Sequence, residues 1–202
     1  MNKKTLTILV LAIVILGAGA GLYVLNSKNK ATFEYEQYSS FKLSGPEQGA
    51  GLAFDKPVEL TKYSSSNDQV ELLHQWKSGG KNGETYMAAA SVTGTYTLPK
   101  NSIVSLDSQT ITNIKKFVTD RMPLGWETKL GTQETFKNNY IKDNAWFFTF
   151  SSSKNQNLFE GEVIYVISGS EYYFFLTSSN KDNWQANTVV WDHITQSLKI
   201  DQ

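Results

Sequence analysis

The chain has 202 residues, with 19 basic and 19 acidic side chains and no cysteine. The absence of cysteine excludes a disulfide framework, a thiolate metal site and a thiol nucleophile. Four of the lysines precede residue 31, so the remainder holds 15 basic and 19 acidic residues, a net charge of −4, which argues against a nucleic-acid-binding protein.

An uncharged apolar run, Thr5–Leu25, directly follows Lys3 and Lys4. As a helix it would extend roughly 31 Å, at about 1.5 Å per residue, which is close to the hydrocarbon thickness of a bilayer. The two lysines favour the cytoplasmic side, so the rest of the chain is expected outside the cytoplasm. The side chains expected to contact lipid are Leu6, Ile8, Leu9, Val10, Leu11, Ile13, Val14, Ile15, Leu16, Leu22, Val24 and Leu25.

Two interpretations of this run stay open. Its length up to Leu25 favours retention as a signal anchor, whereas cleavage after Ala20 would release a secreted protein. Retention predicts a cytoplasmic tip (1–4), a transmembrane helix (5–25), a juxtamembrane linker (26–32) and an extracytoplasmic domain (33–202). Gly17 and Gly21 match the G-x-x-x-G spacing, so this helix is also a candidate for self-association.

The first part of the domain has the pattern of a sheet. Apolar and polar residues alternate in short stretches between residues 33 and 61, which predicts short strands. Val70–Thr95 is predicted to form a hairpin, because residues 78–83 have the composition of a turn.

The period then changes, and Ser105–Met122 is predicted to form an amphipathic helix. Asp107 is the expected N-cap, and Pro123 and Gly125 end the helix. The residues on its apolar arc are Ile111, Ile114, Phe117, Val118 and Met122.

The second half returns to strands and closes with a helix. Short separators imply that the predicted strands are antiparallel neighbours, and residues 146–150 and 172–176 are apolar on both faces, which indicates central strands covered on each side. Asp182 and Gln185 resemble a capping box that begins the closing helix. The predicted strands are Glu134–Ile141, Ala145–Ser151, Leu158–Ser168 and Tyr172–Ser178, and the apolar face of the closing helix holds Trp184, Val190, Trp191, Ile194 and Leu198.

This order predicts an α+β fold in which helices pack on an antiparallel sheet. The segments Gly161–Tyr165 and Glu171–Thr177, then Trp184 and the tail Ser197-Leu198-Lys199-Ile200, resemble the PsbP-like family. The resemblance is best over residues 146–200. The tail has Leu198 where the family has Phe, and no Trp follows Pro57 as it does in the family's opening motif.

The resemblance implies an α/β/α sandwich around an antiparallel sheet and a role in binding or assembly. It brings no catalytic residues. A bacterial-type signal anchor stands in place of a thylakoid transit peptide, so no photosynthetic role is carried over, and a shared fold does not transfer a function.

The residues themselves offer little chemistry. Asp192 and His193 are adjacent on a predicted helix and point about 100° apart, so they cannot form the orienting pair of a triad. His193 is expected to be a solvated surface residue, and His74 a histidine at the rim or surface of the sheet. No spacing of ligands matches a metal site, so we expect no enzyme activity, no metal and no cofactor.

Exposed tryptophans are the remaining candidates for binding. Trp126 follows a predicted turn, and Trp76 lies in a strand pattern, so both are candidate partner-binding residues. We expect a non-catalytic extracytoplasmic domain that binds a protein or cell-envelope component, using the loops around Trp126 and Ser152–Asn157. The alternatives are a cell-wall glycan-binding module or hydrolase, which needs two convergent carboxylates, and a small-ligand carrier, which needs an apolar pocket.

Overall fold

The computed structural model describes residues 37–44, 51–67, 71–78, 84–93, 105–169 and 171–201. The expected cytoplasmic tip, transmembrane helix with Gly17 and Gly21, and juxtamembrane linker lie outside these residues. Within the described ranges, no helix has the length and apolarity needed to cross a bilayer.

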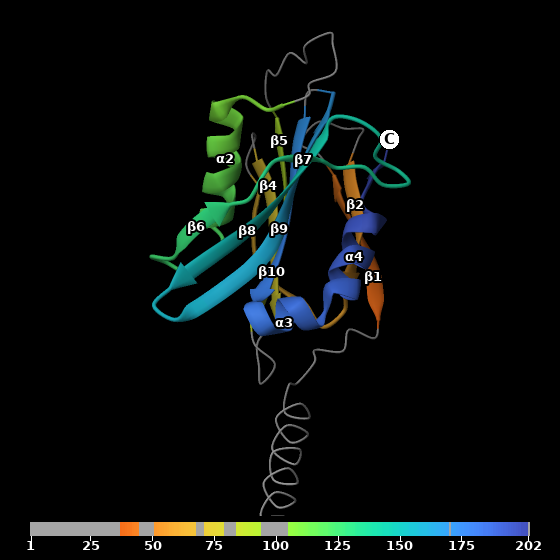
Figure 1. Ribbon diagram of the computed structural model, residues 1–202. Coiled ribbons are helices and arrows are strands. Elements are labelled where there is room, and N and C mark those ends of the chain that lie inside the picture. The colour runs from red at the N-terminus through yellow and green to blue at the C-terminus, as the bar shows by residue number, and fades with distance from the viewer. Residues whose placement is uncertain are drawn as a thin grey trace, which may run out of the picture. The chain divides into compact units, whose positions relative to one another are not determined.

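A large antiparallel sheet forms the centre of the fold (Figure 1). Its strands follow the order β3-β4-β5-β10-β9-β8-β6, and the short β7 also pairs with β8. Four central strands are joined by the registers Phe175↔Ala89, Phe175↔Ile164 and Phe147↔Ile164. The strand bounds are β3 Thr61–Asn67, β4 Glu71–Ser78, β5 Thr85–Thr93, β6 Glu127–Leu130, β7 Glu134–Thr135, β8 Ala145–Lys154, β9 Asn157–Ser168 and β10 Glu171–Asn180.

Each face of this sheet has its own cover. One face packs against α2 (Ser108–Thr119), and the other packs against α4 (Thr188–Ser197) and a small sheet of β1 (Tyr38–Ser44), β2 (Gly51–Pro57) and β11 (Lys199–Asp201). The short α3 (Lys181–Ala186) lies against β9 and β10 at one end of the sheet (Figure 1). The described domain is therefore built in three layers.

The two interfaces between the layers are filled with large side chains. On the α2 side, Phe117 stacks on Phe174 with ring centroids 4.7 Å apart. On the α4 side, Phe54 of β2 contacts both Phe175 and Trp76, with ring centroids 4.8 and 5.8 Å apart. The alternation of side chains along β8, β9 and β10 sends successive residues into these two cores, which is why the strands are apolar on both faces.

Several sequence predictions are confirmed. The helix predicted over Ser105–Met122 is α2, and the Thr110 amide donates to Asp107 Oδ1 at 2.7 Å, as expected of an N-cap. The predicted hairpin consists of β4 and β5, which pair antiparallel. The strands that follow are antiparallel neighbours, as their short separators indicated.

The cover on the α4 side differs from the helical layer that the sandwich expectation implied. Part of it is the three-stranded sheet, in which β11 pairs with β2 through Ile200↔Leu52. Leu43, Leu52 and Phe54 are at most 1 % exposed there, so strands rather than helices cover much of this face. Within the tail Ser197-Leu198-Lys199-Ile200, α4 therefore ends at Ser197 and β11 begins at Lys199.

The closing helix and one predicted strand also differ from the predictions. Asn187 interrupts the helix, and the N-cap of α3 is Asn180, whose Oδ1 accepts from the Asn183 amide at 2.9 Å, instead of Asp182. The predicted strand Glu134–Ile141 is only the two-residue β7.

The predicted loop Ser152–Asn157 is largely strand. Ser152 is fully buried and its hydroxyl lies 2.9 Å from that of Thr128, which holds it in the sheet. The chain turns only at Asn155 and Gln156, because Lys154 already pairs with Asn157. Asn155 has a φ of 57°, a conformation that asparagine tolerates better than most residues.

Candidate functional site

One end of the large sheet keeps a polar face beside α3. On β8, Ala145 and Phe147 point into the α4-side core, and Thr149 and Ser151 continue the same face beyond it. Their cross-strand neighbours on β9 are Glu162 and Glu160. Thr149 is exposed and Ser151, Glu160 and Glu162 are half-buried, so the covering layer leaves this row of hydroxyl and carboxyl groups only partly covered.

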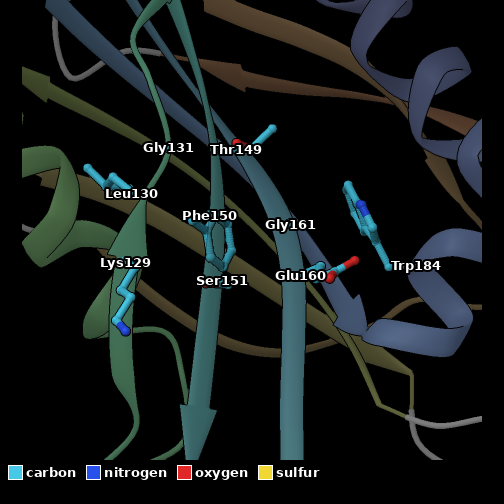
Figure 2. A pocket seen from close by; sticks show the side chains of 9 residues that line it. All are labelled: Lys129, Leu130, Gly131, Thr149, Phe150, Ser151, Glu160, Gly161 and Trp184. Atoms are coloured by element: carbon cyan, nitrogen blue, oxygen red, sulfur yellow. The ribbon is translucent and has the colours of Figure 1, made fainter.

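A groove of about 350 Å³ lies on this face. It is open to solvent and is bounded by three strands and one helix (Figure 2). Its lining comprises Lys129 and Leu130 on β6, Gly131 directly after β6, Thr149, Phe150 and Ser151 on β8, Glu160 and Gly161 on β9, and Trp184 on α3.

Trp184 forms one wall of the groove. Its ring is half-buried and stacks on Trp191 of α4, with centroids 5.0 Å apart and an interplanar angle of 7°. The Trp191 Nε1–H also donates to the Trp184 carbonyl oxygen at 3.1 Å. These two contacts fix the orientation of the Trp184 ring, which stands across the groove from Thr149 (Figure 2).

A buried polar network holds α3, and with it Trp184, against the sheet. Asn183 Nδ2 donates to Thr85 Oγ1 at 3.1 Å and also reaches Ser179 Oγ. Asn187 Nδ2 donates to Asn183 Oδ1 at 2.8 Å. Asn183 is 5 % exposed and Asn187 is 8 % exposed, and both side-chain amides are hydrogen-bonded. The network therefore fixes the position of this short helix on the sheet.

Gly131 leaves the Thr149 hydroxyl accessible. The Gly131 amide donates to the Thr149 carbonyl oxygen at 2.8 Å, which brings the two backbones close together. A β-carbon at position 131 would lie 2.4 Å from Thr149 Oγ1. A glycine is therefore required here if the hydroxyl is to keep its place at the groove.

Glu160 and Glu162 differ in their surroundings. The Gln185 Nε2 donates to Glu160 Oε2 at 3.3 Å at the edge of the groove. Glu162, the cross-strand neighbour of Thr149, is half-buried and has no hydrogen-bond partner among the residues that the structure describes. Burial, and secondarily the negative charge of Asp192, raises the pKa of Glu162 to about 7. Near neutral pH this carboxyl is consequently a mixture of its charged and neutral forms.

A second buried carboxyl, Glu171, is satisfied inside the protein and is structural. It is 4 % exposed and accepts from Ser91 Oγ at 3.2 Å and from the Tyr173 hydroxyl. Burial, followed by this hydrogen bond, raises the pKa of Tyr173.

No known family profile and no curated protein matches the sequence of this chain. Among solved structures, cyanobacterial PsbP from Synechocystis sp. PCC 6803 superposes with a TM-score of 0.54 at 11 % identity, covering 80 % of this chain and 92 % of that one. The chain has a PsbP-like fold. LpqN of Mycobacterium tuberculosis, a protein involved in cell envelope biogenesis, matches with a TM-score of 0.45 at 12 % identity over 83 % of this chain and 93 % of its own.

Neither of the two predicted binding tryptophans lines the groove. Trp76 is 3 % exposed and lies between Phe41 and Phe54 in the α4-side core, so its ring has no free surface for a partner and the prediction of a binding role for Trp76 is wrong. Trp126 is half-buried with its ring 5.1 Å from Phe159. The neighbouring Leu124 is 95 % exposed, so this turn does lie at the surface.

The histidines of the PsbP-like domain have separate surroundings. His193 is exposed and its Nε2 lies 3.3 Å from Asp55 Oδ2, whereas Asp192 interacts with Glu162. The two adjacent side chains of α4 therefore point apart, as predicted. His74 is half-buried and stacks on Trp76, and burial, with a smaller effect of Lys62, lowers its pKa. Across the described ranges, no three histidine or acidic side chains gather as metal ligands.

The sequence interpretation missed the groove, although part of its signal was visible. Thr149 and Ser151, like Glu160 and Glu162, alternate with apolar residues at the two-residue period of a strand. This period shows that each pair shares one face. It does not show that the cover of that face ends at these positions, because that depends on where α3 and α4 lie.

Proposed function

We propose that the chain is a membrane-anchored extracytoplasmic domain that binds a partner or cell-envelope component through the groove beside Trp184, without catalytic activity. The lysine-flanked apolar run Thr5–Leu25 supports the anchor and the topology. The groove supports the binding role. Self-association through Gly17 and Gly21 belongs to the same proposal.

The observation that carries the binding role is the set of unused polar groups at the groove. Lys129, Thr149 and Ser151 make no side-chain hydrogen bond or ion pair with any residue that the structure describes. Lys129 and Thr149 are exposed and Ser151 is half-buried, whereas the buried amides of the Asn183 network are satisfied within the fold. Groups that converge on a concave surface and stay unpaired are available to a ligand.

Cross-linking from the groove tests this proposal, and the chain suits it because it has no cysteine of its own. The variant Lys129→Cys would carry a thiol-specific photo-cross-linker in intact cells. Lys115→Cys, exposed on α2 at the opposite face, is the matched control. We expect a heavier adduct from position 129 only. Equal adducts from both positions, or none from position 129, would contradict a binding role for the groove.

One observation favours the hydrolase alternative as a second candidate. Glu160 and Glu162 lie two residues apart on one face of β9, about 7 Å apart along the strand, so the two neighbouring carboxyl groups that such a hydrolase needs are present. Glu162 in its neutral form would protonate the leaving oxygen, and Glu160 would accept a proton from the attacking water. Release of new reducing ends from a glycan, lost in Glu162→Gln, would favour this candidate over a binding domain.

The small-ligand carrier receives no such support. The space that a carried ligand would need between the sheet and α4 is occupied by Tyr173, Phe175 and Trp191, each at most 1 % exposed. The groove itself has polar side chains on its floor. We therefore do not propose a carrier function.

A further inference from the structure

The charge balance of the groove indicates a neutral ligand. Lys129 supplies one ammonium donor, Glu160 one carboxylate acceptor, and Thr149 and Ser151 two hydroxyls that both donate and accept. Across the strands, Lys129, Ser151 and Glu160 stand in one row. A phosphate paired with Lys129 would still face the Glu160 carboxylate, and an ammonium ligand paired with Glu160 would still face the Lys129 ammonium. A neutral molecule rich in hydroxyl groups can use all four side chains.

The aromatic wall adds a second requirement. One face of Trp184 is covered by Trp191 at 5.0 Å, yet the ring still lines the groove, so part of its apolar surface is turned toward the open space. Indole rings pack well against flat apolar surfaces and are frequent anchors at binding sites. Because Trp191 already fixes the ring, little conformational freedom is lost when a ligand packs on it.

We infer that the groove binds a saccharide: the apolar face of a pyranose ring packs on Trp184, and its hydroxyl groups bond to Thr149, Ser151 and Glu160. This rests on the proposed binding function of the same groove. The side chains of Thr149 and Glu160 point toward the side on which Trp184 stands, as the packing of a single ring between them requires (Figure 2). The volume of about 350 Å³ lies near the lower limit of ligand pockets, about 300–1,000 Å³.

Titration of the full chain in lipid nanodiscs with defined trisaccharides tests the inference. Detergents with sugar headgroups must be left out, since they would compete. The probes are maltotriose, cellotriose and N-acetylchitotriose, so that a glucose-type sugar is distinguished from an amino-sugar glycan. We expect saturable binding of one of them with a dissociation constant on the order of 1 mM or below. Calorimetry and tryptophan fluorescence measure this binding.

Three variants assign that binding to the groove. Thr149→Val and Glu160→Gln keep the size of the side chain and are expected to weaken binding about threefold to tenfold, the effect of losing one hydrogen bond. Trp184→Leu is expected to remove detectable binding. Tyr140→Ala, which alters an aromatic residue 62 % exposed outside the groove, is the control and should leave binding unchanged. Thermal unfolding of each variant would verify that it is folded.

Two results would overturn the inference. One is the lack of saturable binding of all three sugars, and the other is binding that Thr149→Val and Glu160→Gln leave unaltered. Either result leaves the cross-linking experiment at position 129 unaffected, so loss of the saccharide assignment and loss of the binding function are separate outcomes.

Discussion

At the scale of single residues, Glu162 is the side chain whose environment departs most clearly from that of a structural group. Burial and the nearby Asp192 raise its pKa from 4.5 to about 7. The folded protein therefore holds a proton between about pH 4.5 and 7 that the unfolded chain has already released. Stability is greatest below this window, falls as the pH rises through it, and is constant above it as far as this residue is concerned.

The variant Glu162→Gln should remove this pH dependence, because the amide is neutral at every pH. The free energy of unfolding of the variant relative to the wild type should increase between pH 4.5 and 7 by up to about 3 kcal/mol. Urea unfolding of both proteins over a series of pH values measures the difference. Asp192→Asn should shrink the window, since one of the two causes of the raised pKa is removed. Parallel curves of unfolding free energy against pH for Glu162→Gln and the wild type would contradict a raised pKa of Glu162.

At the scale of elements, α3 connects the stability of the fold to the geometry of the groove. This helix has only six residues, too few to be stable in isolation, and it is held by its cap and by the amide network of Asn183 and Asn187. Loss of either support would weaken the attachment of α3, and with it the placement of Trp184 at the groove wall.

The cap of α3 offers a test of this connection. Asn180→Ala removes the acceptor of the Asn183 amide and is expected to lower the free energy of unfolding by about 1 kcal/mol. The same variant should also lower the affinity for a ligand that binds beside Trp184. Asp182→Ala, at the residue that the sequence pattern suggests as the cap, should have the smaller effect. Thermal unfolding of the two variants side by side is the measurement, and the reverse ranking would contradict the cap seen in the structure.

The sequence predicts those elements that depend on neighbouring residues. Asp107 and the apolar arc of α2 lie within one segment, as do the alternating residues of β8, β9 and β10, so local patterns are sufficient for them. The strand β11 has three residues and exists only because it pairs with β2, far away in the chain. Asn187 interrupts the last helix through bonds to Asn183 that no composition indicates.

In the candidate site, too, some features depend on neighbouring residues and others on contacts between distant parts of the chain. That Glu160 and Glu162 share a strand face can be predicted from their spacing. That this face stays open, and that Trp184 stands at its border instead of deep in the core, depends on how two elements pack on the sheet. Trp76 is the converse case, because its strand pattern is compatible with exposure until β1 and β2 are seen to cover it.

At the scale of the whole molecule, the chain combines an apolar run near its N-terminus with a domain of PsbP-like fold that carries an open polar groove. The apolar run predicts that the domain lies outside the cytoplasm, and the groove predicts where on the domain a partner binds. The likeness to cyanobacterial PsbP supports the fold, while the binding role depends on side chains of this chain alone.

Topology is the central claim, and cysteine accessibility in intact cells tests it most directly. Gln156→Cys places the only thiol of the chain at the exposed turn between β8 and β9, and Asn2→Cys places it before the apolar run. A membrane-impermeant maleimide should label position 156 in intact cells and position 2 only after lysis. Protection of position 156 until the cells are lysed would contradict an extracytoplasmic domain.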